Sequence, residues 1–486
     1  KNRKELLKLM YDLDVKGYGT FPVGFGMTVD AKNSSRYIIG IGQSGIGLDP
    51  EYYTHPNEQQ KAVVAAYKSL NNDLLKMVGN APAVAKKKME AAFALEDRIA
   101  KVSYDQVKSR DPQANYHPMT WEQLLKDYPG IDWNYLLKAT GFPDNGGKVD
   151  VGQPEPVHEV EKILATAPLE SLKAYMELAV VSSAAGMLSD NFTDRKFEYT
   201  KVAYGVQQQQ PRWKRALSFV QGIMGEAVGK LYVQKYFPES SKQRMIALVR
   251  NLQTAFAQRI EENTWMTAAT KAKALEKLNA FDIKIGYPDK WQNMDSVFVI
   301  DEARSLFDNV KGVQEAAMKY RIAKRWGKPV DKKEWHMTPQ TVNAYYSPMT
   351  NSINFPAAIL QPPFFDPEVD DAANYGAIGA VIGHEMSHAF DDQGCQFDKE
   401  GNMKNWWNET DKKNYDARTK VLVDWFSQQE VIPGLKVNGE KTLGENIGDN
   451  GGLNVAYRAL ENSMEQNPLA DKDGFTPAQR FFQIGR

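Results

Sequence analysis

Cysteine is almost absent from this sequence, in which Cys395 is the only one among 486 residues. A single thiol excludes any intrachain disulfide, so the fold cannot depend on the covalent cross-links that stabilise many secreted domains. This composition is typical of a cytosolic protein, or of an extracytoplasmic bacterial protein that never depended on disulfides.

Long apolar runs and an excess of one charge are also absent. No apolar stretch approaches the ~20 residues that a membrane-spanning helix needs, and the first residues, Lys1-Asn2-Arg3-Lys4-Glu5, do not have the pattern of a signal peptide. Sixty basic residues against 61 acidic ones give a net charge of −1. This balance provides no electrostatic argument for binding nucleic acid or an anionic membrane. The length predicts two or three domains rather than one core.

One motif in the chain has a specific chemistry. The apolar run that starts at Tyr375 ends in His384, Glu385 and His388, which form the pattern H-E-x-x-H. On a helix, residues four apart lie on one face, so both imidazoles can bind one metal ion. A catalytic zinc takes three protein ligands and a water, whose pKa falls to about 7. Glu385 is placed to accept the proton of that water. The cysteine, Cys395, lies seven residues after His388 and is a poor candidate for a metal ligand.

A third ligand has to come from another part of the chain. Glu445 and Asp449 are four residues apart in G-E-N-I-G-D-N-G-G, on one face if this segment is helical. Glu445 would complete a site of two histidines and one glutamate. Asp449, and also Asp391, could accept the second N–H of a ligating histidine and fix its tautomer. The alternative is a helix N-terminus with ordinary surface charge.

The two motifs resemble those of the neprilysin and endothelin-converting-enzyme family of zinc metallopeptidases. H-E-M-S-H-A-F-D-D begins at His384, and G-E-N-I-G-D-N-G-G begins at Gly444. Similar stretches occur at residues 213–214, 232–237, 285–291, 342–346 and 354–365. The resemblance therefore extends over nearly the whole chain. Animal members are disulfide-rich ectodomains, so this chain is more similar to the bacterial branch.

The resemblance implies a mainly α fold of two domains that enclose a central chamber. Residues 1–286 would form a helical lid domain. Residues 287–486 would form a thermolysin-like catalytic domain with a small β-sheet, incomplete at its C-terminal end. The resemblance also implies one Zn²⁺ per chain, bound by His384, His388 and Glu445. It implies that Glu385 and Asp449 are the catalytic residues beside these ligands.

The implied activity is hydrolysis of oligopeptides on the amino side of bulky hydrophobic residues. In the family, Asn343 and the backbone of Ala344 hold an extended substrate, and Phe364 and Val381 line the pocket that follows the scissile bond. From the residues alone, the block Thr341–Phe355 is predicted to be a hairpin, for which a structural role is as well supported as substrate binding. Without the resemblance, Phe364 and Val381 would be predicted to be core residues.

Two family segments have no counterpart here. One is an N-terminal aromatic stretch, and the other is a C-terminal stretch whose histidine and arginine stabilise the oxyanion and bind the substrate backbone. We therefore expect Lys1 and Arg486 to be internal positions of a longer protein, with the remaining N- and C-terminal segments as partners. Because loss of one oxyanion donor costs about 10²–10³ in rate, this chain alone should be a poor catalyst. The resemblance places it outside the cytoplasm, in the bacterial periplasm, on the cell surface or secreted.

Sequence features also decide which alternative functions and sites are retained and which are rejected. One alternative function is that of a peptide-binding module that retains zinc but does not cleave the bound peptide. An aminopeptidase would need a motif such as G-x-M-E-N, which is absent. The pattern G-x-G-x-x-G at Gly40–Gly45 is rejected as a dinucleotide site, because no helix is expected to begin there. Residues 56–281 are predicted to be mainly helical, with Lys277 on a solvated face.

Overall fold

The computed structural model describes residues 2–485, which form two compact units. Unit 1 combines residues 2–30, 36–223 and 293–330, and unit 2 combines residues 31–35, 224–292 and 331–485. The predicted boundary between residues 286 and 287 treats each domain as one continuous stretch, whereas each unit combines three. The chain passes from unit 1 to unit 2 within helix α10 (Arg212–Tyr236), at Met224, which has non-helical dihedral angles.

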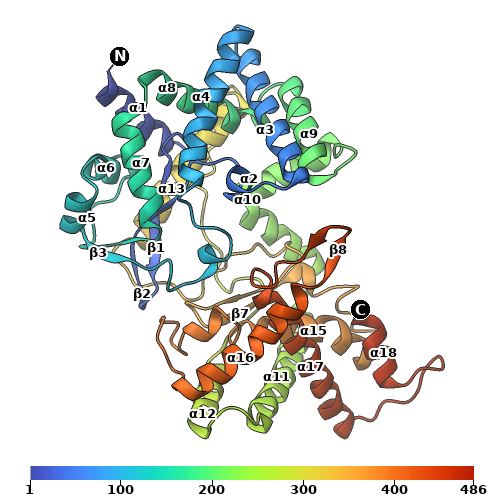
Figure 1. Cartoon of the computed structure of the whole chain (residues 1–486). Coiled ribbons are helices and arrows are strands. Elements are labelled where there is room, and N and C mark those ends of the chain that lie inside the picture. The colour runs from blue at the N-terminus through green and yellow to red at the C-terminus, as the bar shows by residue number, and fades with distance from the viewer. Residues whose placement is uncertain (1, 486) are drawn as a thin grey trace. The chain divides into compact units, whose positions relative to one another are not determined.

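Unit 1 is mainly helical and contains a four-stranded sheet in the order β1-β2-β4-β3 (Figure 1). Strand β2 is parallel to β4, and β3 is antiparallel to β4. The strands are β1 (Val23–Asp30), β2 (Asn33–Gln43), β3 (Pro118–Thr120) and β4 (Lys148–Val151). The α-helices are α1 (Arg3–Asp14), α2 (Glu51–Thr54), α3 (Glu58–Met77), α4 (Pro82–Ala100), α5 (Trp121–Asp127), α6 (Trp133–Thr140), α7 (Pro154–Thr166), α8 (Leu169–Ala184), α9 (Asp190–Tyr204) and α13 (Leu306–Arg325).

Apolar residues at helical spacing build the core of unit 1. Helix α3 begins at a capping box, in which the side chains of Asn57 and Gln60 each accept from the other's backbone N–H. Val63, Leu70 and Leu74 then point into the core, as the 3.6-residue period predicts. Helices α3 and α4 therefore pack through one face each, and the helical interpretation of this region is confirmed.

Unit 2 contains the second part of α10, two small sheets and seven further α-helices among the described residues. The helices are α11 (Glu239–Glu262), α12 (Ala268–Asn279), α14 (Asp371–Asn374), α15 (Ala380–Ser387), α16 (Glu409–Phe426), α17 (Leu443–Gln466) and α18 (Pro477–Ile484). The strands are β5 (Asp282–Gly286), β6 (Tyr345–Ser347), β7 (Ser352–Pro356), β8 (Glu430–Ile432) and β9 (Leu435–Lys436). The mainly α fold with small sheets is thus confirmed.

The predicted hairpin in residues 341–355 is present in unit 2. Strand β6 pairs antiparallel with β7, and β7 pairs parallel with β5, so the order is β5-β7-β6. Asn351 closes the turn with a φ of 46°, a left-handed conformation that asparagine adopts more readily than most residues. Strand β7 is completely buried, whereas β6 lies at the edge of the sheet.

Lys277 contradicts the prediction of a solvated position, because only 1% of it is exposed. It lies on the buried stripe of α12 together with Thr270 and Ala274, at spacings of one and two helical turns. Its ammonium group is compensated by three backbone carbonyl oxygens from residues more than a hundred positions away. The periodicity alone indicated burial, but these distant acceptors cannot be seen in the sequence.

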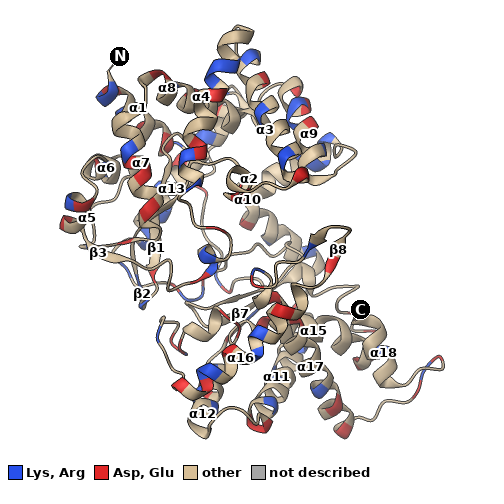
Figure 2. Ribbon diagram, viewed as in Figure 1, with Lys and Arg blue, Asp and Glu red and all other residues tan. Residues whose placement is uncertain are grey.

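Charge is distributed evenly over the helices and strands. Figure 2 shows Lys and Arg interspersed with Asp and Glu along the elements of both units, in keeping with the net charge of −1. Within residues 2–485, none of the helices combines the length and the apolar character that crossing a bilayer requires.

Candidate metal centre

Two helices of unit 2 carry the predicted metal ligands. His384 and Glu385 lie in the last turn of α15, and His388 is its C-cap residue. Glu445 lies in the first turn of α17, and Asp449 lies one turn later. The apolar residues of α15, such as Ile382 and Met386, are buried in the core of the unit. The two histidines of the motif are therefore held on the opposite side of a fixed helix, and the buried Glu385 lies between the two sides.

A close contact between glycines brings the two helices together. A Cβ added to Gly383 would lie 2.7 Å from the carbonyl oxygen of Gly452, and one added to Gly452 would lie 2.6 Å from the backbone nitrogen of His384. Only residues without a side chain permit this approach. A Cβ on Gly448 would lie 2.8 Å from the ring of His384. Helix α17 can therefore pass directly beside the histidines.

The three predicted ligands converge at this contact. The Nε2 atoms of His384 and His388 are 2.9 Å apart. The Oε2 atom of Glu445 lies 3.4 Å from Nε2 of His384 and 3.9 Å from Nε2 of His388. Ligand atoms about 2.1 Å from a tetrahedral zinc ion would be about 3.4 Å from one another. Among residues 2–485, this is the set of His, Cys, Asp and Glu side chains close enough to bind a metal ion together.

The orientation of the two rings also fits a cation. Nδ1 of His384 is 2.9 Å from Oδ1 of Asp449, and Nδ1 of His388 is 2.8 Å from Oδ2 of Asp391. Because an ionised carboxylate can only accept, each Nδ1 carries a hydrogen, and in the neutral rings each Nε2 keeps its lone pair. The two lone pairs then face each other, which is favourable only with a positive charge between them. The donor set of two imidazoles and a carboxylate is one that zinc prefers.

Both aspartates are held as acceptors. The hydrogen bond from His384 lowers the pKa of Asp449 below its ordinary value, so Asp449 stays ionised. The other oxygen of Asp391, Oδ1, accepts the backbone N–H groups of Gln393 and Gly394 at 2.9 and 2.7 Å. Asp391 is buried, and its carboxylate is thus fixed by its own loop on one side and His388 on the other.

Glu385 lies beside the ligands but is not one of them. Its side chain is 6% exposed, and this burial raises the pKa of its carboxyl group above the ordinary value. The charges of the two histidines and a hydrogen bond from the backbone N–H of Tyr346 act in the opposite direction. A buried carboxylate with a raised affinity for protons is suited to accept one from water.

The predicted substrate-binding residues are all in unit 2, and Val381 lies on α15 with His384 and Glu385. Asn343 is exposed and Ala344 is buried immediately before the edge strand β6, with the Asn343 side chain accepting the N–H of Ala344 at 2.9 Å. Phe364 and Val381 are half-buried and pack against the core of the unit. Their part in binding a substrate stays a prediction.

Sequence reasoning missed Lys277 and the role of the glycines. A signal for the glycines was present, because Gly448, Gly451 and Gly452 stand inside a helical segment, where each glycine costs about 1 kcal/mol relative to alanine. Glycine at such a position indicates close packing.

Replacing Asp449 with asparagine is expected to weaken zinc binding by about 10–100-fold while the protein stays folded. The amide cannot hold the Nδ1 hydrogen of His384 as a carboxylate does, and the side chain is exposed enough to tolerate the change. Competition with a zinc-binding dye measures the affinity. Asn450→Asp, which adds a carboxylate at the next position of α17, is the control. Unchanged affinity in Asp449→Asn would show that His384 needs no such partner.

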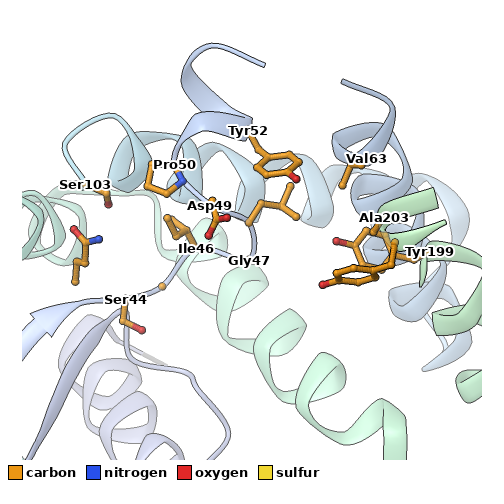
Figure 3. A pocket seen from close by; sticks show the side chains of 14 residues that line it. Ser44, Ile46, Gly47, Asp49, Pro50, Tyr52, Val63, Ser103, Tyr199 and Ala203 are labelled. Atoms are coloured by element: carbon orange, nitrogen blue, oxygen red, sulfur yellow. The ribbon is translucent and has the colours of Figure 1, made fainter. Parts of the chain in front are cut away.

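The rejected glycine pattern lies in unit 1, whereas the ligands belong to unit 2. Gly40 and Gly42 are within strand β2, and the next helix, α2, begins only at Glu51. The loop between them lines a cavity of about 470 Å³ together with Tyr52 and Tyr199 (Figure 3). A phosphate site of the dinucleotide type needs a helix N-terminus directly after the glycines, which is not found here.

Comparison with known families gives two matches that together cover most of the chain. Residues 1–288 match the model of the N-terminal region of peptidase family M13, and residues 343–484 match the second model described as peptidase family M13. The chain is 33% identical over 441 residues to the neutral endopeptidase of Lactobacillus helveticus, covering 91% of this chain and 68% of that protein. It is 33% identical over 464 residues to human endothelin-converting enzyme 1, but spans only 58% of the length of that protein.

Solved structures give the same result. The zinc metalloprotease Zmp1 of Mycobacterium tuberculosis, in complex with an inhibitor, superposes with a TM-score of 0.94 at 40% identity. The match covers 100% of this chain and 74% of that one. PepO of Lactobacillus rhamnosis superposes with a TM-score of 0.90 at 26% identity, over 100% of this chain and 76% of that one.

Proposed function

Because the chain belongs to peptidase family M13, the family that includes neprilysin and the endothelin-converting enzymes, we propose that its metal centre hydrolyses peptide bonds in oligopeptides. The observation that carries this proposal is the convergence of His384, His388 and Glu445 on one point, with Glu385 beside them. We propose one zinc ion per chain, since this is the metal-binding set found within residues 2–485.

The residues of the site divide the work of hydrolysis. His384, His388 and Glu445 would hold a zinc ion, which would supply a Lewis acid able to polarise the peptide carbonyl and to lower the pKa of water. Glu385 accepts a proton from the attacking water at its carboxylate and transfers this proton to the nitrogen of the leaving amine. Asp449 and Asp391 fix the rings of the two histidines through Nδ1 and keep both Nε2 lone pairs on the side where the rings meet.

The edge strand β6 provides a binding mode for the substrate. An extended peptide can add to an exposed sheet edge through main-chain hydrogen bonds. Asn343 and Ala344 directly precede this strand, and Tyr346 within it donates its backbone N–H to Glu385. A peptide bound there would run past the carboxylate that takes the proton. We assign Asn343 and the Ala344 backbone to this contact, and Phe364 and Val381 to the pocket for a bulky hydrophobic residue after the scissile bond.

The proposed setting is outside the cytoplasm, in a bacterial periplasm, on a cell surface or secreted. The similarity to bacterial M13 peptidases supports it, and the single cysteine is compatible with it. We also propose the remaining N- and C-terminal segments, which the sequence leads us to expect, as partners of this chain.

Metal removal and product mapping test the proposed function. We expect cleavage of a small peptide library to stop after treatment with a zinc chelator and to return when zinc is added. Mass spectrometry of the products should place the new amino termini at Phe, Leu or Tyr. A peptide with glycine at that position is the control. Zinc and peptide binding with no cleavage under any condition would instead indicate a binding module.

A further inference from the structure

Lys277 is a buried lysine whose hydrogen-bond acceptors are not carboxylates. Its Nζ atom donates to the carbonyl oxygens of Ala389, Gly394 and Phe397 at 2.8, 2.6 and 2.7 Å. All three acceptors belong to residues 389–397, the loop that follows the second histidine of α15. An ammonium group has three donors, and here each has a carbonyl partner.

Three aromatic rings and the C-terminus of α15 also lie near the ammonium group. The rings of Phe390, Tyr346 and Trp406 have their centroids 5.7, 5.8 and 5.9 Å from Nζ, within the range of cation–π attraction. The carbonyl of Ala389 stands just beyond the C-terminus of α15, where the partial charge of a helix is negative. Burial lowers the pKa of Lys277 to about 7, although the nearby Cys395, Asp391 and Asp398 act in the opposite direction.

The loop that Lys277 holds is the one that orients a metal ligand. Asp391, which accepts from Nδ1 of His388 at 2.8 Å, lies between two of the carbonyls bound by Lys277. Gly394 contributes twice, because its carbonyl accepts from Lys277 and its N–H donates to Asp391. The contacts thus run from Lys277 through the loop to Asp391 and then to the imidazole of His388.

We propose that Lys277 is a positioning residue of the metal centre, which fixes the loop of residues 389–397 so that Asp391 holds His388 in the orientation needed to bind zinc. This inference rests on the proposed metal-dependent function. The three hydrogen bonds of the Lys277 Nζ atom all go to this loop, so its effect on the ligands is exerted through the loop. Without Lys277, the carbonyl of Ala389 loses its donor, whereas the carbonyls of Gly394 and Phe397 each lose one of two donors and keep the N–H of Phe397 and of the Trp406 ring.

Lys277→Met tests this role, since methionine keeps the length of the side chain but removes its donors. We expect zinc affinity to fall by about 10–100-fold and kcat to fall with little change in KM. Amide hydrogen exchange in the metal-free protein should become faster in residues 389–397. Lys277→Gln, which keeps two donors, should show smaller changes of the same kind. Asp391→Asn should weaken zinc binding similarly, and the double variant with Lys277→Met should be no worse than Asp391→Asn.

Lys284 supplies the matched control. It is a second buried lysine of unit 2, whose Nζ donates to the carbonyl of Glu334 at 3.0 Å, and it belongs to strand β5. Lys284→Met should lower the melting temperature without changing zinc affinity or exchange in residues 389–397. An equal loss of zinc affinity in this control would reduce the role of Lys277 to general stability and overturn the proposal.

Other outcomes also decide the question. Unchanged zinc affinity and loop exchange in the folded Lys277 variants would refute it. So would losses in the double variant that simply multiply, because Lys277 would then act independently of Asp391. If neither Lys277 variant folds, the residue serves folding rather than positioning. A wild-type protein that binds zinc but cleaves no peptide would remove the proposed function, while zinc affinity and exchange would still test the connection from Lys277 to His388.

Discussion

Glu385→Gln is expected to keep zinc bound and to lower kcat for peptide cleavage by about 10²–10⁴-fold. The substitution preserves the size of the side chain, which matters because Glu385 is buried. It removes the carboxylate that accepts the proton of the attacking water, but it does not touch the ligands His384, His388 and Glu445. KM should change much less than kcat, since the substitution affects the proton-transfer step and not the binding of the substrate.

Steady-state kinetics and the zinc content of the same preparation test this expectation. Glu465→Gln is the control, because Glu465 is an exposed residue near the end of α17, well beyond the first turns that carry Glu445 and Asp449. It should keep full activity. Cleavage by Glu385→Gln at more than a tenth of the wild-type rate would remove Glu385 from the mechanism. Loss of zinc from this variant would mean that Glu385 helps to hold the ion.

Gly452→Ala is expected to separate the two ligand-bearing helices. The added methyl group would lie 2.6 Å from the carbonyl oxygen of Ala380 and 2.6 Å from the backbone nitrogen of His384. These are backbone atoms that cannot rotate away, so α15 or α17 has to shift. Overpacking of this kind typically costs about 1–3 kcal/mol in the free energy of unfolding. A displacement of about 1 Å at a catalytic site can cost about 100-fold in kcat/KM.

Denaturant titration, zinc affinity and kinetics on this variant measure the three effects. Gly312→Ala is the matched control, because a Cβ at Gly312, inside helix α13, has no atom within 4 Å. It should raise stability by up to about 1 kcal/mol through helix propensity alone and leave zinc affinity unchanged. If Gly452→Ala behaves like Gly312→Ala, the glycine contact does not set the position of Glu445.

The metal centre was predictable because its pattern is local. The spacing of His384 and His388 on one helix, and of Glu445 and Asp449 on another, is fixed by the helical period, and the structure brings the predicted ligands within 4.8 Å of one another. The hairpin before β7 was predictable for the same reason, since turn residues separate two extended segments.

Features that depend on tertiary contacts were not predictable. Lys277 was assigned to a solvated face, although its carbonyl acceptors lie in a loop more than a hundred residues later. The close approach of Gly383 and Gly452 joins two segments that no local pattern connects. No local sequence pattern indicates that α10 begins in one compact unit and ends in the other. The roles of Asn343, Ala344, Phe364 and Val381 stay predictions.

The origin of the ligands from two separate helices has a thermodynamic consequence. Helix α16 and the β8–β9 hairpin lie between α15 and α17 along the chain, so an unfolded polypeptide does not present the three donor groups together. Any ion that prefers the assembled geometry therefore stabilises the native state of unit 2 in proportion to the logarithm of its free concentration. The bound cation would therefore stabilise the tertiary structure of unit 2 in addition to its part in catalysis, and removal of zinc would make this unit easier to unfold.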